Sequence, residues 1–176
     1  MIDLGQIQSE ILEWGDSNFP APDDETYFRR ACIGLIEEIG EIAHIVLKRE
    51  QGIRPEDTTD EKLRDGIGDA GIYLLHAGGH GRGLKGVWKP HAISSLRGAD
   101  DPLDAVGALA FSAARLYARR TALLYAPWNG ADAVYLNLSA VASLYGWRAE
   151  ECIAETWRNV VGKRDWQSHP NDGVSR

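Results

Sequence analysis

The sequence predicts an all-α protein, an antiparallel bundle of about five to six helices. Apolar residues recur every three to four positions through most of the chain, which is the spacing of a helix that buries one face. Valine, isoleucine and tyrosine residues follow this spacing and do not alternate with polar residues, so they give no strand pattern. The 176 residues, 44% of them hydrophobic and 26% charged, are enough for a single domain with its own core.

The first half of the chain is expected to form three helices joined by short turns. The first spans about 2–17 and stops before the proline-containing stretch NFPAPDD. The second starts at an aspartate cap, 23 or 24, and runs to about 50, where QGIRPEDT forms the turn. The third follows a threonine cap, 58 or 59, and runs to about 77. Short turns place the second and third helices side by side and antiparallel.

The third predicted helix contains three glycines, Gly66, Gly68 and Gly71. Each costs ~1 kcal/mol relative to alanine inside a helix. We therefore expect a neighbouring helix or a ligand to approach closely where their side chains are missing.

The second half of the chain begins with a glycine-rich stretch, 78–102, which is expected to form a functional or mobile loop. It is not a phosphate-binding P-loop, because Leu84 stands where that motif has a lysine and no strand precedes it. A solvated loop is favoured over a lid formed by Arg82, Lys85 and Lys89. Helical spacing returns at 103–125, 131–145 and 149–163, before a short frayed tail.

The overall charge limits the partners. A formal net charge of −7 and a pI near 5.2 argue against nucleic acid, whose phosphates require a basic surface. An acidic protein that handles phosphates usually recruits a divalent cation. The chain shows neither a signal-peptide pattern nor a membrane-spanning apolar run, so no membrane partner and a cytoplasmic location are expected. Cys32 and Cys152 are expected to be reduced core residues.

Two segments concentrate acidic residues where a helix would otherwise be apolar, IEEIGEIAH at 36–44 and RDGIGDAGIY at 64–73. Residues three or four apart share a helix face, so two helices packed antiparallel can direct up to five carboxylates into one volume. Like charges at that range require a cation or shifted pKa values. Carboxylate oxygens favour Mg²⁺, and Mn²⁺ is expected to substitute for it. The predicted metal ligands are Glu37, Glu38, Glu41, Asp65 and Asp69.

Two other interpretations of these acids were weighed. An acidic cluster on a helix usually forms solvent-exposed salt bridges. Here the isoleucines around the glutamates leave only a narrow polar face on the helix, which disfavours that role. A di-iron centre would use Glu41 and His44 as a Glu-x-x-His pair. It requires that pattern twice, and Asp69 is followed three residues later by Ile72.

In order along the chain, these motifs resemble the MazG-like all-α nucleoside triphosphate pyrophosphohydrolases of phages and bacteria. That family carries Glu-x-x-Glu on one helix and Glu-x-x-Asp on the next, and EEIGE followed by DGIGD is similar to this pair. EWGDSNFP at 13–20 resembles the element before the catalytic helices. ETWRNVVGKRDWQSHP at 155–170 resembles the closing helix and the stretch after it. The sequence departs from the family at Gly66, where a glutamate is expected; Asp65 is the candidate replacement.

The resemblance implies hydrolysis of a (d)NTP to the monophosphate, with release of pyrophosphate or of two phosphates in succession. A metal-activated water would attack phosphorus, and Glu37 or Glu38 would accept its proton. The predicted phosphate contacts are Lys48, Lys163 and Arg164. The predicted base and sugar contacts are Trp14, Asn18, Phe19 and Tyr73. Purine deoxynucleotides, dUTP and dCTP remain alternative substrates.

The resemblance also implies a homodimer or homotetramer, with the fourth and fifth helices as the contact surface. If the protein is phage-encoded, it would act in the host cytoplasm. The alternative function is a non-catalytic helical oligomerisation module whose metal site has decayed at Gly66.

Overall fold

A computed structural model describes residues 2–79, 100–118, 128–159 and 161–164. These residues form helices and turns without a strand, which confirms the all-α prediction. None of the described helices is long and apolar enough to cross a membrane. The α-helices are α1 (Leu4–Asn18), α2 (Asp24–Glu50), α3 (Asp60–Gly79), α4 (Pro102–Ala118), α5 (Trp128–Leu144) and α6 (Ala149–Asn159). Two short 3₁₀ helices are η1 (Pro55–Asp57) and η2 (Val161–Lys163).

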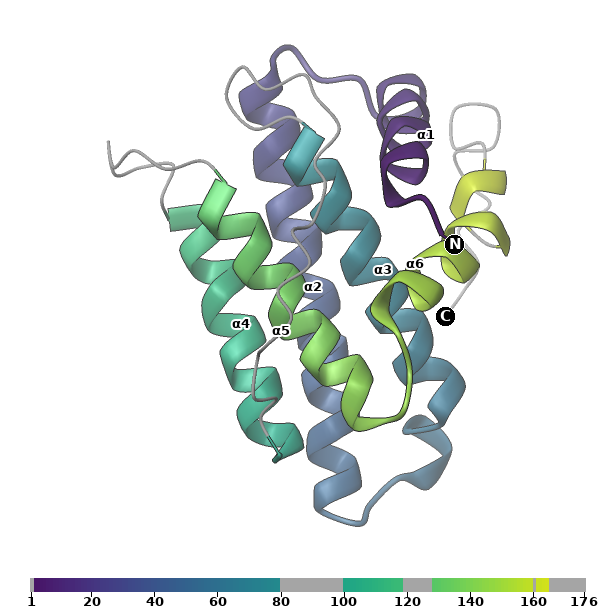
Figure 1. Ribbon diagram of the computed structural model, residues 1–176, viewed down its shortest axis with the longest axis vertical. Coiled ribbons are helices and arrows are strands. Elements are labelled where there is room, and N and C mark those ends of the chain that lie inside the picture. Colours follow the sequence, from purple (N-terminus) through teal and green to yellow (C-terminus); the bar gives the residue numbers. More distant parts are fainter. Residues whose placement is uncertain (1, 80–99, 119–127, 160, 165–176) are drawn as a thin grey trace.

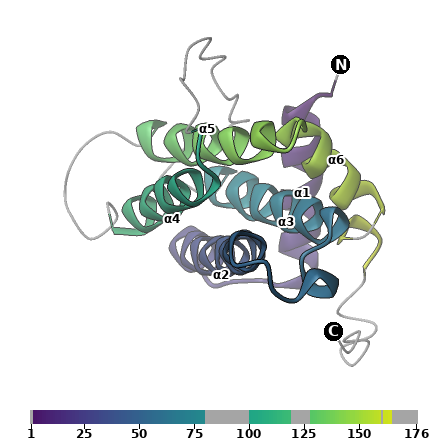
Figure 2. The same ribbon diagram turned by 90° about the horizontal axis from the view of Figure 1, so that it is seen from below.

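Four of these helices form a bundle within one chain (Figures 1 and 2). α2 packs against α3 and α4, and α5 packs against the same two helices. α6 lies against the outer side of α3, and α1 packs on both α3 and α6. The described helices therefore enclose their core without a second copy of the chain.

Side-chain caps explain where the first two helices begin: α1 starts two residues later than predicted, and α2 starts at the predicted aspartates. Asp3 Oδ1 accepts from the backbone N–H groups of Gly5 and Gln6, at 2.9 and 3.2 Å. Asp23 Oδ1 accepts from the Thr26 N–H at 2.7 Å. Each carboxylate satisfies backbone donors that have no partner inside the helix.

The later helices differ from the prediction mainly at their ends. α5 starts at Trp128, earlier than expected, and α6 ends at Asn159, with η2 in place of a continuous helix. α4 is described to Ala118, and the rest of that predicted helix lies outside the described residues. Residues 80–99 of the predicted loop, including Arg82, Lys85 and Lys89, also lie outside them, as does the tail after 164.

The glycines of α3 allow α6 to approach, as the sequence predicts for a neighbouring helix. A Cβ added at Gly71 would lie 2.2 Å from Ile153 Cγ1, and one added at Gly68 would lie 2.1 Å from Thr156 Oγ1. Both separations are far shorter than a van der Waals contact, so a side chain at either position would force Ile153 or Thr156, or α6 itself, to shift. α6 and the segment after it depend on these two glycines for their position.

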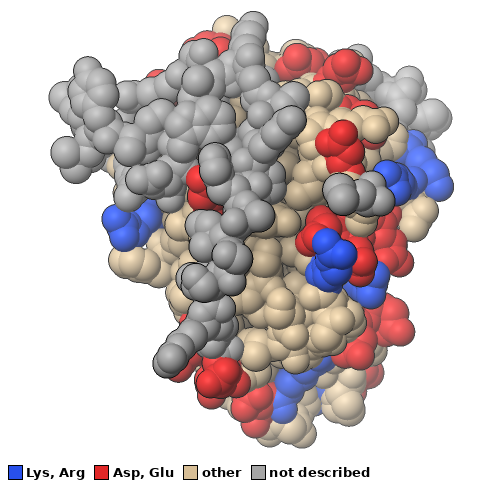
Figure 3. All heavy atoms as spheres, viewed as in Figure 1, with Lys and Arg blue, Asp and Glu red and all other residues tan. Residues whose placement is uncertain are grey.

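Arginine and aromatic side chains fix the turn between α5 and α6. Tyr145 and Trp147 stack with ring centroids 5.5 Å apart. Arg49 lies over the Tyr145 ring, and Arg64 lies over the Trp147 ring while also pairing with Glu155 at 2.8 Å. Basic and acidic side chains are intermingled on this side of the molecule (Figure 3). These contacts join the start of α6 to the α2 and α3 pair.

Both cysteines are free and buried in the core, as predicted. Burial raises the pKa of the Cys32 thiol to about 12 and that of the Cys152 thiol to about 11. They are therefore protonated, unreactive packing residues at neutral pH.

Candidate functional site

Glu38 is the buried carboxylate of the predicted acidic cluster, with only 4% of its surface exposed. Gly34 and Ile42, four residues before and after it, both contact α3. Residues four apart share a helix face, so Glu38 lies on the strip of α2 that faces α3. A carboxylate is costly to bury unless charged or hydrogen-bonding groups compensate it, which marks this position as chemically special.

Asp69 occupies the matching position on α3. Gly66, three residues before it, lies against Ile42, and Tyr73, four residues after it, lies against Gly34. Asp69 is half-buried between these two contacts. Glu38 and Asp69 therefore lie on facing strips of an antiparallel helix pair, between the same two points of contact.

Asp65 lies on another side of α3. Thr156 Oγ1 of α6 donates to Asp65 Oδ1 at 3.5 Å, while the next residue, Gly66, faces α2. One residue along a helix turns the side-chain direction by about 100°. A Cβ added at Gly66 would lie 3.3 Å from Ile42 Cγ1, so this corner of the interface is closely packed.

The predicted acids do not form one group in this structure. Glu37 and Glu41 are exposed on α2, Glu38 is buried, and Asp65 is directed toward α6. Among the described residues, which include all five acids, no set of three or more acidic, histidine or cysteine side chains could hold a metal ion. The facing pair of Glu38 and Asp69 is what remains of the expected cluster.

Tyr73 and His76 connect this pair to α1. The Tyr73 ring fills the space beside Gly34, where an added Cβ would lie 2.3 Å from it. The His76 ring lies beside Gly15 of α1 and 5.9 Å from the Tyr27 ring. Burial raises the pKa of the Tyr27 phenol above its usual range. The acidic strip thus continues into an aromatic junction of three helices.

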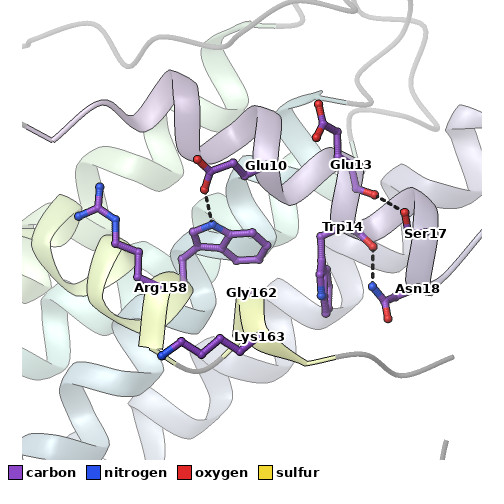
Figure 4. Close-up of a pocket in the computed structure, with 9 residues that line it drawn as sticks. Glu10, Glu13, Trp14, Ser17, Asn18, Arg158, Gly162 and Lys163 are labelled. Carbon is purple, nitrogen blue, oxygen red and sulfur yellow. Dashed lines mark hydrogen bonds between the residues drawn. The ribbon is translucent and has the colours of Figure 1, made fainter. Parts of the chain in front are cut away.

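A pocket lies between α1 and the end of α6, with a volume of about 520 Å³ (Figure 4). It includes three of the predicted substrate contacts, Trp14, Asn18 and Lys163. The other lining residues are Glu10, Glu13, Ser17, Trp157, Arg158 and Gly162. The lining combines two tryptophans with two cations and two carboxylates, so its formal charges balance. The aromatic surface suits a planar heterocycle.

The two tryptophans hold the walls of this pocket together. Trp14 Nε1 donates to the Arg164 carbonyl at 2.8 Å, and Trp157 Nε1 donates to Glu10 Oε2 at 2.8 Å. Their rings meet edge to face with centroids 5.8 Å apart. Phe19, another predicted base contact, packs edge to face on Trp14 with ring centroids 5.5 Å apart, and it is exposed and does not line the pocket.

Pocket residues Trp157, Glu10 and Arg158 were not predicted. Glu10 lies one helical turn before Trp14, and Trp157 falls within the stretch that resembles the closing helix, so both signals were present. Their partnership joins residues 147 positions apart, and local spacing does not reveal such a contact.

The three predicted phosphate contacts lie at two separate places, the end of α2 and η2. Lys48 is half-buried near the end of α2, and its Nζ donates to Gln51 Oε1 at 3.4 Å. Lys163 and Arg164 are exposed at η2. The structure therefore brings Lys163 to the pocket and leaves Lys48 near the turn between α2 and α3.

Helix α1 separates the pocket from the acidic strip. Gly15 faces His76 of α3, while its neighbour Trp14 lines the pocket. Asp69 and His76 are seven residues apart on α3, or about 10 Å along the helix axis.

Searches with this sequence and structure found no matching protein-family model, curated protein or solved structure.

Proposed function

We propose that this chain is a Mg²⁺-dependent nucleotide pyrophosphohydrolase that converts a (d)NTP to the monophosphate and so controls a nucleotide pool. The observation that carries the proposal is the pair formed by Glu38 and Asp69 on facing strips of α2 and α3. A pocket lined by two tryptophans, two cations and two carboxylates lies across α1 from this pair. The resemblance of the sequence motifs to MazG-like enzymes supports the same activity.

Carboxylate oxygens suit Mg²⁺, and Glu38 and Asp69 are the two predicted ligands that lie on facing strips. Glu38 and Asp69 would hold the ion, with Glu41 at the exposed edge of the same strip. Mn²⁺ would be held by the same oxygens. When bound, the ion would neutralise phosphate charge and lower the pKa of a coordinated water. Glu37 and Asp65 would not be ligands of the ion, because the Glu37 side chain is exposed and the Asp65 side chain contacts Thr156.

The proposed reaction consumes one water for each phosphoanhydride bond that it breaks. The water oxygen forms a bond to phosphorus, the bond between phosphorus and the leaving phosphate oxygen breaks, and Glu37 or Glu38 accepts the water proton. Attack at the α-phosphorus releases pyrophosphate, and two successive attacks release two phosphates. Lys48, Lys163 and Arg164 would offset the charge of the polyphosphate.

Trp14 is proposed to stack on the base, with Asn18 contacting base or sugar. Tyr73, another predicted contact, packs against Gly34 of α2 and does not line this pocket. Replacing Trp14 with alanine is expected to raise KM about tenfold and change kcat little, because stacking on a base is worth about 1–3 kcal/mol. Trp14→Phe keeps a stacking ring but loses the hydrogen bond to the Arg164 carbonyl. Steady-state kinetics of the two variants should show a smaller rise in KM for Trp14→Phe. Equal KM values for both variants and the native protein would exclude Trp14 from the base site.

The activity is tested by product release from the eight common NTPs and dNTPs, with Mg²⁺, with Mn²⁺ and with a chelator. Hydrolysis that requires the metal is expected for at least one purine deoxynucleotide, dUTP or dCTP. Glu41→Gln should weaken stabilisation of the fold by Mn²⁺, because it removes one carboxylate from the exposed edge of the strip. The enzyme proposal fails if no nucleotide is hydrolysed and neither metal stabilises the native protein.

A non-catalytic helical module is the second candidate. It is favoured by two observations: Gly66 supplies no carboxylate, and the described residues include no set of three potential ligands. This candidate predicts no metal-dependent stabilisation in the same titration. A homodimer or homotetramer and a cytoplasmic location, in the host if the gene is viral, belong to both proposals.

A further inference from the structure

The pocket between α1 and α6 has an acidic side and a basic side. Glu10 and Glu13 belong to α1, whereas Arg158 belongs to α6 and Lys163 to η2. The indole rings of the two pocket tryptophans lie between the glutamates and Lys163 (Figure 4). A planar ligand stacked on an indole therefore meets hydrogen-bond acceptors along one edge and donors along another.

The two carboxylates of the acidic side differ in their hydrogen bonds. Glu10 is fixed in place, because its Oε1 accepts from Gln6 Nε2 at 2.9 Å and its Oε2 accepts from Trp157 Nε1 at 2.8 Å. No hydrogen bond or ion pair joins the exposed Glu13 side chain to another residue in the described part of the chain. Both Glu13 oxygens are therefore available to a ligand.

A carboxylate distinguishes nucleobases by the number of adjacent donors that they present. Guanine presents two on one edge, N1–H and the N2 amino group, and carries the acceptors O6 and N7 on the neighbouring edge. Adenine and cytosine present one amino group beside a ring-nitrogen acceptor. Uracil and thymine present one N–H between two carbonyl oxygens. Acceptor atoms next to a carboxylate repel it, so an acidic wall favours guanine over the other bases.

We propose that this pocket selects guanine and that Glu13 determines the specificity, by accepting hydrogen bonds from N1–H and the N2 amino group. Arg158, exposed on the opposite wall, donates to O6 and N7, the contact that arginine most often makes with guanine. The inference rests on the proposed function, because it identifies the hydrolysed nucleotide as a guanine nucleoside triphosphate.

Binding of nucleoside monophosphates in the presence of a chelator tests the selection without requiring hydrolysis. The full chain should bind dGMP at least about tenfold more tightly than dIMP, which lacks only the N2 amino group, and more tightly than dAMP, dCMP or dTMP. Glu13→Gln should bring the dissociation constants of dGMP and dIMP together, because an amide has one acceptor oxygen and its NH₂ group opposes a base donor. Isothermal titration calorimetry measures each dissociation constant.

Two further variants separate specificity from a general loss of binding. Arg158→Gln should weaken dGMP and dIMP by similar factors and preserve their ratio, because both bases keep O6 and N7. Glu151→Gln is the matched control, at an exposed glutamate of α6 outside the pocket, and should change neither constant. All three substituted side chains are exposed, and far-ultraviolet circular dichroism establishes that each variant is folded.

Hydrolysis of dGTP and dITP with Mg²⁺ distinguishes failure of this inference from failure of the proposed function. The native protein should hydrolyse dGTP with the higher kcat/KM. Metal-dependent hydrolysis without a preference for dGTP over dITP, or a preference that Glu13→Gln leaves unchanged, would overturn guanine selection by Glu13 and leave the enzyme proposal standing. Selective binding of dGMP without hydrolysis of any triphosphate would support guanine selection and overturn the enzyme proposal.

Discussion

Replacing Glu38 with glutamine is expected to reduce nucleotide hydrolysis at least ~100-fold, the lower end of what a positioned acid or base contributes. Glu38 is 4% exposed and lies on the strip of α2 that faces α3. Glutamine keeps the size of the side chain but can neither accept a proton nor bind a cation as a carboxylate does. The loss is expected whether Glu38 is the base or a metal ligand.

The fold should tolerate this change. Glutamine keeps the size and hydrogen-bonding capacity of the side chain, so the free energy of unfolding without metal should change by no more than about 1 kcal/mol. The measurement combines product release with thermal unfolding, with Glu50→Gln at the exposed end of α2 as the matched control. If Glu38→Gln retains native activity, the interface of α2 and α3 is not the reaction site. If both activity and stability collapse, Glu38 has a structural role.

The position of Glu38 illustrates what the sequence can predict. Capping residues and apolar spacing predicted the bounds of α2 and α3 to within about two residues, because both signals act over a few residues of the chain. The acids of the two segments were expected to face each other across this helix pair, and in the structure Glu38 and Asp69 lie on the facing strips. These are properties of one helix or of two helices joined by a short turn.

Asp65 shows where such reasoning stops. Asp65 and Gly66 are consecutive residues, yet Asp65 accepts a hydrogen bond from Thr156 of α6 while Gly66 faces α2. Choosing between these directions requires knowing that α6, from the other end of the sequence, occupies that side of α3. Glycines at 68 and 71 predicted a close neighbour there, but nothing in their spacing identified which helix it is.

The pocket between α1 and α6 follows the same limit. Trp14 was predicted to contact the base because of its motif. The contacts that hold Trp14 in place, with the Trp157 ring and the Arg164 carbonyl, were not predicted. The docking of α6 on α3 creates this wall, so the position of the pocket depends on residues that do not line it. Among the glycines of α3, Gly68 leaves the least space for a side chain.

The expected effect of Gly68→Ala is therefore a loss of stability of about 1–3 kcal/mol, despite alanine's better helix propensity. The added Cβ would lie 2.1 Å from Thr156 Oγ1 and 2.9 Å from the Cys152 carbonyl oxygen, a backbone atom that cannot turn aside. α6 must shift, and the pocket shifts with it, so KM should rise as well. Thermal and denaturant unfolding measure the first effect, and a loss of 1 kcal/mol lowers Tm by about 2–4 °C in a chain of this size.

The matched control is the same substitution at Gly40, on the exposed side of α2, where an added Cβ would meet nothing within 4 Å. Gly40→Ala should stabilise the protein by up to about 1 kcal/mol through helix propensity alone and leave KM unchanged. The opposite signs separate packing from propensity, since both variants make the same chemical change within a helix. Stabilisation by Gly68→Ala would mean that α6 does not pack on this glycine. It would also contradict the position of the pocket wall that α6 forms. Destabilisation by both variants would instead indicate a general intolerance of these helices to alanine, against the close contact described at Gly68.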